Sequence, residues 1–418
     1  MNANVKRTIA GAAAALLAAS GVACGPGEPR EVAEARRQIE EAWQGGPQLK
    51  VLVLTLAADH PGLPEADPLI DEALASPSFE MRREAVATLA RWGTPGATDR
   101  IRPLLEDGNE LVRRAAARAL ARLGDGSGRE LLEKARRTAE GVLDTETCAA
   151  LAAIGSRVCA EEAERDINSE DGVKVAAAAA ALEAAGDDRA RLVLRGALKA
   201  QHGERRAPVI EALGAIGGAE DVAAILPYAR YRENVIAVIR ALGRLGGDQA
   251  VAKLRTYLTA EDPVGRVEAA GALLRAGVLD DAVRKAIDAA VASDREEVRY
   301  RAAEALARAP EGTDVTAWLV RLAGDASAQV RRVAVTALAD RGGDGALEGF
   351  RAAWQASREA QEGAAYTAAL EALRGAARLD GEPARALLAE GLESPNWAHT
   401  IQAAFGLLEQ QHRAAAAP

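Results

Sequence analysis

Residues that commonly carry catalysis or hold metals are few in this 418-residue sequence. It has three cysteines and four histidines, and the histidines are His60, His202, His399 and His412. No histidine is followed by glutamate, and neither residue type has the spacing of metal ligands. The sequence contains no HExxH or GxSxG motif, no Walker-type phosphate loop and no GxGxxG before a helix. We therefore predict that the protein is not an enzyme and has no catalytic residues, no metal site and no cofactor.

Two cysteines, Cys148 and Cys159, stand on either side of Gly155. If Gly155 forms the turn between two helices, the cysteines lie on opposite sides of it, which favours a disulfide in an exported protein. However, Cys148 is seven residues before the glycine and Cys159 only four after it, so their heights along the two helices do not match well. A disulfide and a pair of packed free thiols are therefore equal alternatives from the sequence.

The element that must position the polar residues is a repeated amphipathic helix. Its clearest copy spans residues 112–124, where Val112, Ala116 and Leu120 share one apolar stripe and Gly124 ends the helix. A Leu or Phe equivalent to Leu120 recurs between positions 56 and 405 at intervals of 29 to 35 residues, in most copies with a glycine four residues later. Two helices per period of this length indicate an α-solenoid. No segment alternates with a period of two, so we predict no sheet.

This pattern resembles the HEAT repeat, in particular the short bacterial subtype named after phycobilisome lyases. The resemblance rests on Val-Arg segments at 112–116, 298–302 and 330–334, each followed by an Ala-Leu pair. It implies an all-α superhelix of about twelve helical hairpins, with the second helix of each hairpin on the concave side. We assign residues 49–413 to this solenoid, 31–48 to an N-terminal capping helix and 414–418 to a frayed tail.

The first 23 residues have the pattern of a bacterial export signal. Lys6 and Arg7 precede an apolar run over residues 9–23, and Cys24 follows it directly. The junction resembles the lipobox of bacterial lipoproteins, in which the cysteine is diacylated and becomes the mature N-terminus. The resemblance implies a lipid anchor at Cys24, with residues 24–30 as a tether, and an outer membrane address facing the periplasm. The alternative is ordinary cleavage before Cys24, which yields a soluble exported protein.

Arginines recur at two positions of the second helices. Counted from Val112 as position 0, the stripe occupies positions 0, 4, 7, 8 and 11, and positions 1 and 10 flank it. Position 1 holds Arg82, Arg113, Arg206, Arg266, Arg299 and Arg331, and position 10 holds Arg91, Arg122, Arg244, Arg275 and Arg308. These arginines form either a basic ladder for an anionic partner or ion pairs with carboxylates of the inter-helix turns. We favour the ion pairs, because both flanks are expected to point into the stack and the net charge is −9.

Positions 2, 5, 6 and 9 then form the predicted open face of the second helices. This face begins with three arginines, Arg83, Arg114 and Arg118. In the middle of the chain it becomes small and apolar, at Ala176, Ala180, Ala207, Ile236 and Val267 among others. It is either a shallow groove for a partner helix or peptide, or a run of residues used only as helix formers, and the sequence does not decide between the two.

An aromatic pair, Tyr228 and Tyr231, stands at the shortest interval between repeats. The two rings are either partner contacts or packing residues that seal a tight turn, and we favour packing.

These features predict a non-enzymatic interaction scaffold, a HEAT-repeat lipoprotein of the cell envelope that binds a protein or peptide on its concave face. Its membrane contact is the lipid on Cys24, and the net negative charge argues against a nucleic-acid partner. The alternative is a HEAT-like lyase or another repeat-based enzyme that handles a chromophore. A cluster of His, Cys or acidic residues on the concave face would favour this alternative.

Overall fold

A computed structural model of the chain describes residues 29–138, 145–343 and 345–416. The predicted signal peptide of residues 1–23, the predicted lipidation site Cys24 and the tether up to residue 28 lie outside these residues. The predicted all-α fold is confirmed, because every regular element in the described residues is helical and no strand occurs among them.

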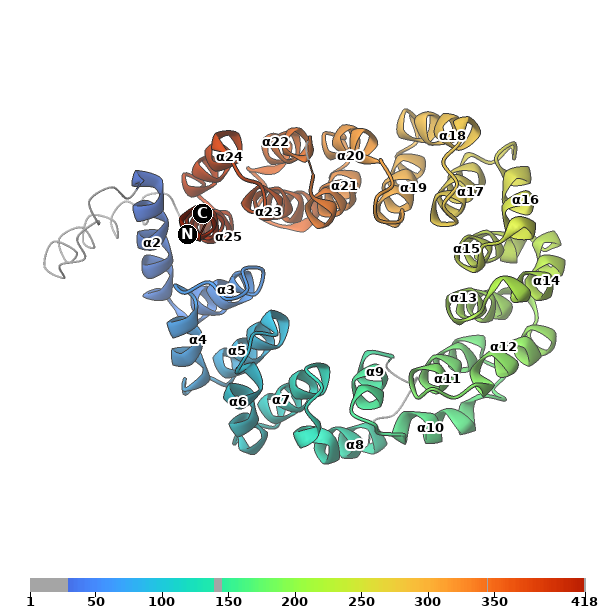
Figure 1. Cartoon of the computed structure of the whole chain (residues 1–418), viewed down its shortest axis with the longest axis horizontal. Coiled ribbons are helices and arrows are strands. Elements are labelled where there is room, and N and C mark those ends of the chain that lie inside the picture. Colours follow the sequence, from blue (N-terminus) through green and yellow to red (C-terminus); the bar gives the residue numbers. More distant parts are fainter. Residues whose placement is uncertain (1–28, 139–144, 344, 417–418) are drawn as a thin grey trace, which may run out of the picture. The chain divides into compact units, whose positions relative to one another are not determined.

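The helices fall into two compact units (Figure 1). Unit 1 combines the described residues up to Thr94 with those from Ala323 onward, and unit 2 is Pro95–Leu322. The helices of unit 1 are α2 (Arg30–Trp43), α3 (Pro47–Ala57), α4 (Asp67–Leu74), α5 (Phe79–Trp92), α21 (Ala328–Arg341), α22 (Ala346–Ser357), α23 (Gly363–Ala377), α24 (Glu382–Leu392) and α25 (Trp397–Ala416). The helices of unit 2 are α6 (Ala97–Ile101), α7 (Glu110–Arg122), α8 (Arg129–Thr138), α9 (Thr145–Ala153), α10 (Val158–Asp166), α11 (Gly172–Ala184), α12 (Arg189–Ala200), α13 (Arg206–Ile216), α14 (Val222–Ile225), α15 (Val235–Leu245), α16 (Asp248–Tyr257), α17 (Pro263–Arg275), α18 (Asp281–Val291) and α19 (Glu296–Ala307). Helix α20 (Thr316–Ala323) ends at the boundary between the units.

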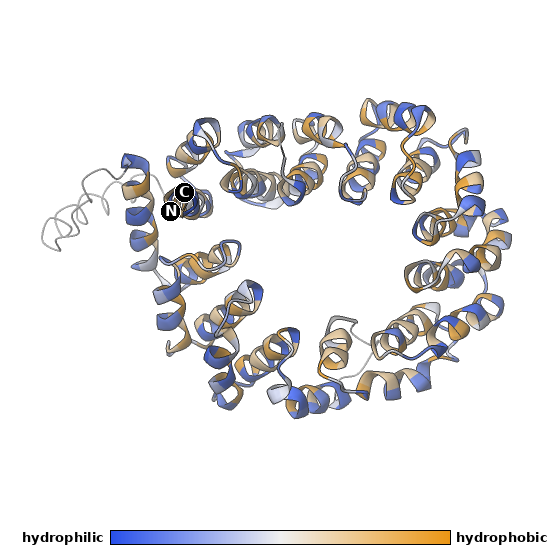
Figure 2. Ribbon diagram, viewed as in Figure 1, coloured by the Kyte–Doolittle hydropathy of each residue, from blue (hydrophilic) through white to orange (hydrophobic). Residues whose placement is uncertain are grey.

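Unit 2 is built of helical pairs in two layers (Figure 1). The even-numbered helices α6 to α18 form a first-helix layer, and the odd-numbered helices α7 to α19 form a second-helix layer. Hydrophilic residues are frequent on the first helices, whereas α11 is apolar on nearly all sides (Figure 2). The leucines that anchor the repeat lie between the layers and are almost completely buried.

Helix α7 shows how the sequence specifies a second helix. The side chain of Asn109 caps its N-terminus by accepting a 2.8 Å hydrogen bond from the Leu111 amide. Val112 and Leu120 are fully buried, as the apolar stripe predicted. The chain then turns at Gly124, whose φ of +78° is a conformation that favours glycine.

Consecutive second helices of unit 2 approach each other closely where small residues meet. A Cβ atom on Gly214 of α13 would lie 2.6 Å from the Cα of Ala241 in α15. A Cβ atom on Gly243 of α15 would lie 2.7 Å from the Cα of Ala272 in α17. Larger residues at these glycines would force the helices apart, so the small residues fix the spacing of the layer.

The position-1 arginines bind backbone carbonyl groups of the turns between the two helices, a contact that the predicted pairing with turn carboxylates did not include. Each donates from Nη1 to the carbonyl oxygen six residues earlier, over 2.6–2.9 Å, at Arg82, Arg113, Arg266, Arg299 and Arg331. These carbonyl oxygens belong to the turn that follows each first helix, where no continuing helix supplies a backbone amide to them. A turn carboxylate such as that of Asp262 instead accepts hydrogen bonds from the amides of Val264 and Gly265 at the start of the second helix.

Unit 1 brings the first and the last helices of the described chain together. Helix α2 packs along α25, and α3 also contacts α25. Arg385 of α24 pairs with Glu31 of α2 at 3.6 Å. The helix predicted as an N-terminal cap therefore forms, and it covers the C-terminal helix as well as the first repeat. Residues 414–416, predicted as part of a frayed tail, continue α25 as exposed helix.

A buried histidine lies at this contact. His60, 1% exposed, donates from Nδ1 to Oε2 of Glu409 at 2.6 Å, and its Nε2 accepts from the Gln402 amide at 3.0 Å. A neutral ring with its proton on Nδ1 satisfies both contacts. Burial disfavours ionisation of Glu409, but the contact with His60 and the charges of Arg413 and Arg378 outweigh it and hold the pKa of this carboxyl below its usual value.

This arrangement predicts that the variant Glu409→Gln destabilises unit 1 at neutral pH. Because the pKa of Glu409 is lowered in the folded state, the ionised carboxyl stabilises the fold above its unfolded pKa of about 4.3. That stabilisation is lost as the pH falls through the folded pKa. We expect the variant to lose about 1–3 kcal/mol of unfolding free energy at pH 7, with the difference shrinking below pH about 4. Urea unfolding followed by tryptophan fluorescence measures it, since four of the five tryptophans lie in unit 1. A variant as stable as wild type at pH 7, or a difference that grows with acidity, would contradict the assignment.

Candidate functional site

The exposed face of the second-helix layer in unit 2 agrees with the predicted one only in part: position 6 is open on most of these helices, as predicted, whereas position 5 is buried. Positions 5 and 9 were predicted to be open, but Ile210, Ile239 and Gly214 at these positions are buried. Val267, predicted as a groove residue at position 2, is also only 1% exposed. The physical reason is the close approach of neighbouring second helices: α17, for example, packs against α15 on one side and α19 on the other.

The positions of this layer that reach solvent on most of its helices are 3, 6 and 10. We call the residues at these positions the open stripe, except for Ala237 at position 3 of α15 and Gly271 at position 6 of α17, which are buried. On α11 and α13 the stripe is formed by small residues and one glutamate, namely Ala177, Ala180, Ala184, Pro208, Glu211 and Ala215. From α15 onward it becomes densely charged, with Arg240, Arg244, Glu268, Arg275, Arg301, Glu304 and Arg308. The stripe thus changes from apolar to arginine-rich along successive repeats.

The other predicted partner-binding residues lie at or near the surface. Arg114 and Arg118 are exposed on α7, and Arg114 pairs with Glu110 at 2.6 Å. The predicted apolar residues of α11, α13 and α15 are half-buried, and they are Ala176, Ala180, Ala207 and Ile236. Arg83 is exposed on α5, which belongs to unit 1. These four half-buried residues, which we call the apolar strip, are what remains of the predicted apolar groove once the buried Val267 is left out.

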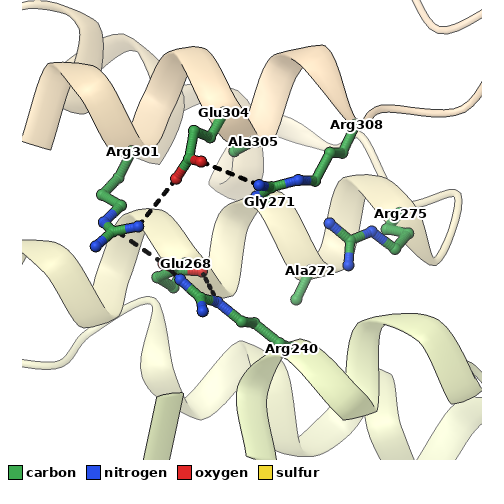
Figure 3. Close-up of a pocket in the computed structure, with 9 residues that line it drawn as sticks. All are labelled: Arg240, Glu268, Gly271, Ala272, Arg275, Arg301, Glu304, Ala305 and Arg308. Atoms are coloured by element: carbon green, nitrogen blue, oxygen red, sulfur yellow. Dashed lines mark hydrogen bonds and ion pairs between the residues drawn. The ribbon is translucent and has the colours of Figure 1, made fainter. Parts of the chain in front are cut away.

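Four arginines and two glutamates of the open stripe line one pocket on α15, α17 and α19 (Figure 3). We call this set the arginine cluster, and it consists of Arg240, Glu268, Arg275, Arg301, Glu304 and Arg308. Its floor is made of small residues, because a Cβ atom on Gly271 would lie 2.5 Å from that of Ala305 on the next helix. The long side chains around the floor therefore converge from three consecutive repeats.

The two glutamates of the cluster hold three of its arginines. Arg240 binds the Glu268 carboxylate through Nε and Nη2, at 3.1 and 2.6 Å. Glu304 accepts from Nη1 of Arg301 at 2.9 Å and from Nη2 of Arg308 at 3.0 Å. The Nε of Arg301 is shielded from solvent and has no hydrogen-bond partner among the described residues, and Glu268 lies 3.9 Å from it.

The remaining arginine of the cluster, Arg275, makes no hydrogen bond or ion pair within the described chain (Figure 3). Partial burial, together with the charges of Arg244, Arg308 and Arg240, holds the pKa of Arg275 below its usual value, although Glu268 opposes the shift. The prediction that the position-10 arginines point into the stack and pair with turn carboxylates is therefore wrong for Arg275. The prediction fails because position 10 was expected to point toward the next repeat, whereas it faces solvent.

Sequence analysis singled out Arg275 and Arg308 but gave no role to Arg240, Glu268, Arg301 and Glu304. The signal that identifies these residues is a charged side chain at position 3, at position 6 or at both in three consecutive repeats. That signal has meaning only once the face that carries positions 3, 6 and 10 is known to be open.

Tyr228 and Tyr231 pack around an arginine of the preceding repeat. Their ring centroids are 6.5 Å apart, and the guanidinium of Arg206 lies 4.4 Å from the Tyr228 ring and 5.6 Å from the Tyr231 ring. Arg206 is itself buried and donates to the carbonyl oxygens of Leu198 and Gln201. This geometry gives both tyrosines a packing role in the turn between repeats.

Cys148 of α9 and Cys159 of α10 form a disulfide in the structure, with their Cα atoms 5.6 Å apart. Both residues are buried in the core of unit 2, at 2% and 4% exposure. Of the two alternatives from the sequence, the structure has the disulfide. The mismatch in height along the helices does not prevent it, because the Cα separation is within the usual range for a bridge.

The described residues hold no group of three or more His, Cys, Asp or Glu side chains suited to a metal ion. Within the same parts of the chain, no helix combines the length and the hydropathy needed to cross a bilayer.

Comparison with known proteins identifies the repeat. A sequence profile of HEAT repeats matches residues 66–153, 229–307 and 283–371, which together span more than half of the chain. The chain belongs to the HEAT-repeat family. The resemblance inferred from the Val-Arg segments and the Leu-Gly period is thereby confirmed, and a repeat scaffold is the part of the functional prediction that this membership supports.

Among curated proteins no match was found. Solved structures with detectable similarity include the complex of CpcE and CpcF of phycocyanin lyase from Nostoc sp. PCC7120. That match has 18% identity and a TM-score of 0.27, and it covers 68% of this chain and 92% of the other. Human deoxyhypusine hydroxylase in complex with glycerol matches at 24% identity and a TM-score of 0.25, over 58% of this chain and 94% of the other. Similarity at this level carries no inference about activity.

Proposed function

We propose that this HEAT-repeat chain is a non-enzymatic scaffold that binds a protein partner along the second-helix layer of unit 2. The observation that carries the proposal is the open stripe, where side chains from successive repeats form one surface on closely packed helices. A rigid, preformed surface loses little conformational entropy on binding, which favours recognition of an extended or helical segment.

The character of the surface suits a protein segment better than a small molecule. Ala180, Ala207 and Ile236 are small or moderately sized and half-buried, so backbone or side-chain atoms of a partner can approach the helices closely. The charged stretch that begins at Arg240 then supplies polar contacts beside the apolar strip. An apolar centre with a charged margin is typical of protein interfaces.

We further propose that the protein is held at the bacterial cell envelope by a lipid on Cys24, as the export pattern of the first 23 residues indicates. The disulfide between Cys148 and Cys159 supports an exported location, because disulfides persist in oxidising compartments. The face that binds the partner would then be presented to the periplasm.

The binding surface is tested by the triple variant Ala176→Glu, Ala180→Glu, Ala207→Glu. Carboxylates at these half-buried sites place charge and bulk on the apolar strip, so capture of a partner from envelope extract by the purified protein should fall about tenfold or more. The matched control replaces exposed alanines of first helices, Ala200→Glu, Ala282→Glu and Ala289→Glu, and should capture as wild type does. Circular dichroism melting verifies that both variants are folded. Equal capture by the two variants would reject the second-helix layer as the binding surface.

The anchor is tested by fractionation of cells that produce the full-length chain. The wild-type protein should sediment with membranes and be released by detergent but not by high salt, whereas Cys24→Ser should not carry the lipid and should lose this behaviour. Mass spectrometry of the mature N-terminus should find a diacylated cysteine. Recovery of the wild-type protein without detergent would instead support cleavage to a soluble exported protein.

A further inference from the structure

We propose that the arginine cluster on α15, α17 and α19 is an anion site that binds a carboxylate side chain of an acidic peptide segment. This inference rests on the proposed function, because it assigns a chemical class to part of the partner. It is carried by three observations on the cluster: its charge imbalance, an arginine without a partner and an unsatisfied donor.

The charge imbalance is local and runs against the composition of the chain. The cluster contains four arginines and two glutamates, so its formal charge is positive by two, whereas the chain as a whole has a net charge of −9. The neighbouring Arg244 adds another cation, and it donates to the backbone carbonyl of Glu211 at 3.3 Å. Like charges brought together from three repeats repel one another, so the folded chain retains an electrostatic cost that a bound anion would remove.

Arg275 is the residue on which this cost is concentrated. Its guanidinium is partly buried among other arginines, and neither Glu268 nor Glu304 forms an ion pair with it. The planar fork of a guanidinium matches the two oxygens of a carboxylate, which can bind in a bidentate manner. The shielded Nε–H of Arg301 is a second donor of the same pocket that lacks an acceptor. Buried donors in folded proteins are usually paired, so a ligand carboxylate would satisfy the Arg301 Nε–H and would also give the partly exposed Arg275 a partner.

The pattern of charges favours a peptide carboxylate over a nucleic-acid backbone. A phosphate backbone carries charges at short regular intervals and needs a continuous basic track. Here Glu211, Glu268 and Glu304 interrupt the arginines along the open stripe, so a regular polyanion would meet repulsion at each of them. A single acidic side chain in an otherwise neutral segment avoids these glutamates, and the rest of the segment lies over the apolar strip at Ile236 and Ala207.

The test uses fluorescence anisotropy of the folded full chain with labelled peptides of about ten residues. One peptide carries a single central glutamate in an otherwise neutral sequence of glycine, alanine and serine, and its matched control has glutamine in place of that glutamate. We expect the wild-type protein to bind the acidic peptide and not the neutral one. The variant Arg275→Gln should weaken binding by about tenfold or more, because it removes a charge-assisted pair. The variant Arg275→Lys keeps the charge but loses the bidentate geometry, so its affinity should lie between the other two.

Folding is followed in the same samples. Because Arg275 has no partner to leave unpaired, Arg275→Gln should melt at the wild-type temperature or above it, while its affinity falls. The matched control Arg137→Gln with Lys199→Gln removes exposed charges from the first helices α8 and α12 and should bind as wild type does.

Three results would overturn the site: no preference of the wild type for the acidic peptide, unchanged affinity in Arg275→Gln, or equal weakening in the control. If a single-stranded oligonucleotide displaces the peptide with the same dependence on Arg275, the peptide assignment is wrong and the partner is a nucleic acid. If the acidic peptide does not bind but capture from envelope extract still depends on Ala176, Ala180 and Ala207, only the anion site fails and the proposed function stands.

Discussion

The close approach of consecutive second helices sets which side chains of unit 2 reach solvent. At the contacts of α13, α15 and α17, glycines face alanines so tightly that no Cβ atom fits on the glycine. This contact buries position 5 of the second helices and, on α13, α15 and α17, position 9, while positions 3, 6 and 10 reach solvent on most of them. The open stripe, its apolar strip and the arginine cluster all follow from that one packing constraint.

Arginine has two distinct roles in this repeat, and the structure separates them by position. At position 1 it donates to carbonyl groups of the turn that precedes its own helix, which ties that turn to the second helix. At position 10 of unit 2 it stands on the open stripe, where Arg244 bonds to the neighbouring repeat, Arg308 pairs with Glu304 of its own helix, and Arg275 has no partner within the described chain. One residue type therefore stabilises the turn between paired helices and also places positive charge on their open surface.

The fold could be read from the sequence because each repeat specifies itself locally. The spacing of Val112 and Leu120 and the turn at Gly124 need no information from elsewhere in the chain. The exposed face could not be read in the same way, because a helical wheel describes one helix and not its contact with the next. Val267 was placed on the wrong side for this reason, and Arg275 was assigned to the stack when it faces solvent.

The contacts between residues far apart in the chain also could not be predicted from the sequence pattern. Nothing in the periodicity of residues 31–48 indicates that this helix packs along α25, or that His60 bonds to a glutamate almost 350 residues later. Such a pairing joins residues that are far apart in the sequence, so no local pattern identifies it. The sequence did contain the residues involved, but it gave no reason to associate them.

The central claim is that the open stripe of unit 2 is the surface that a protein partner touches. Site-specific photocrosslinking in intact cells tests it most directly, with benzoylphenylalanine placed at exposed alanines of the stripe, Ala184 and Ala215, and at exposed alanines of the first helices, Ala200 and Ala289. A discrete crosslinked partner is expected from the two stripe positions, Ala184 and Ala215, and none from the two first-helix positions, Ala200 and Ala289. Crosslinks that form equally from both layers, or only from the first helices, would contradict it.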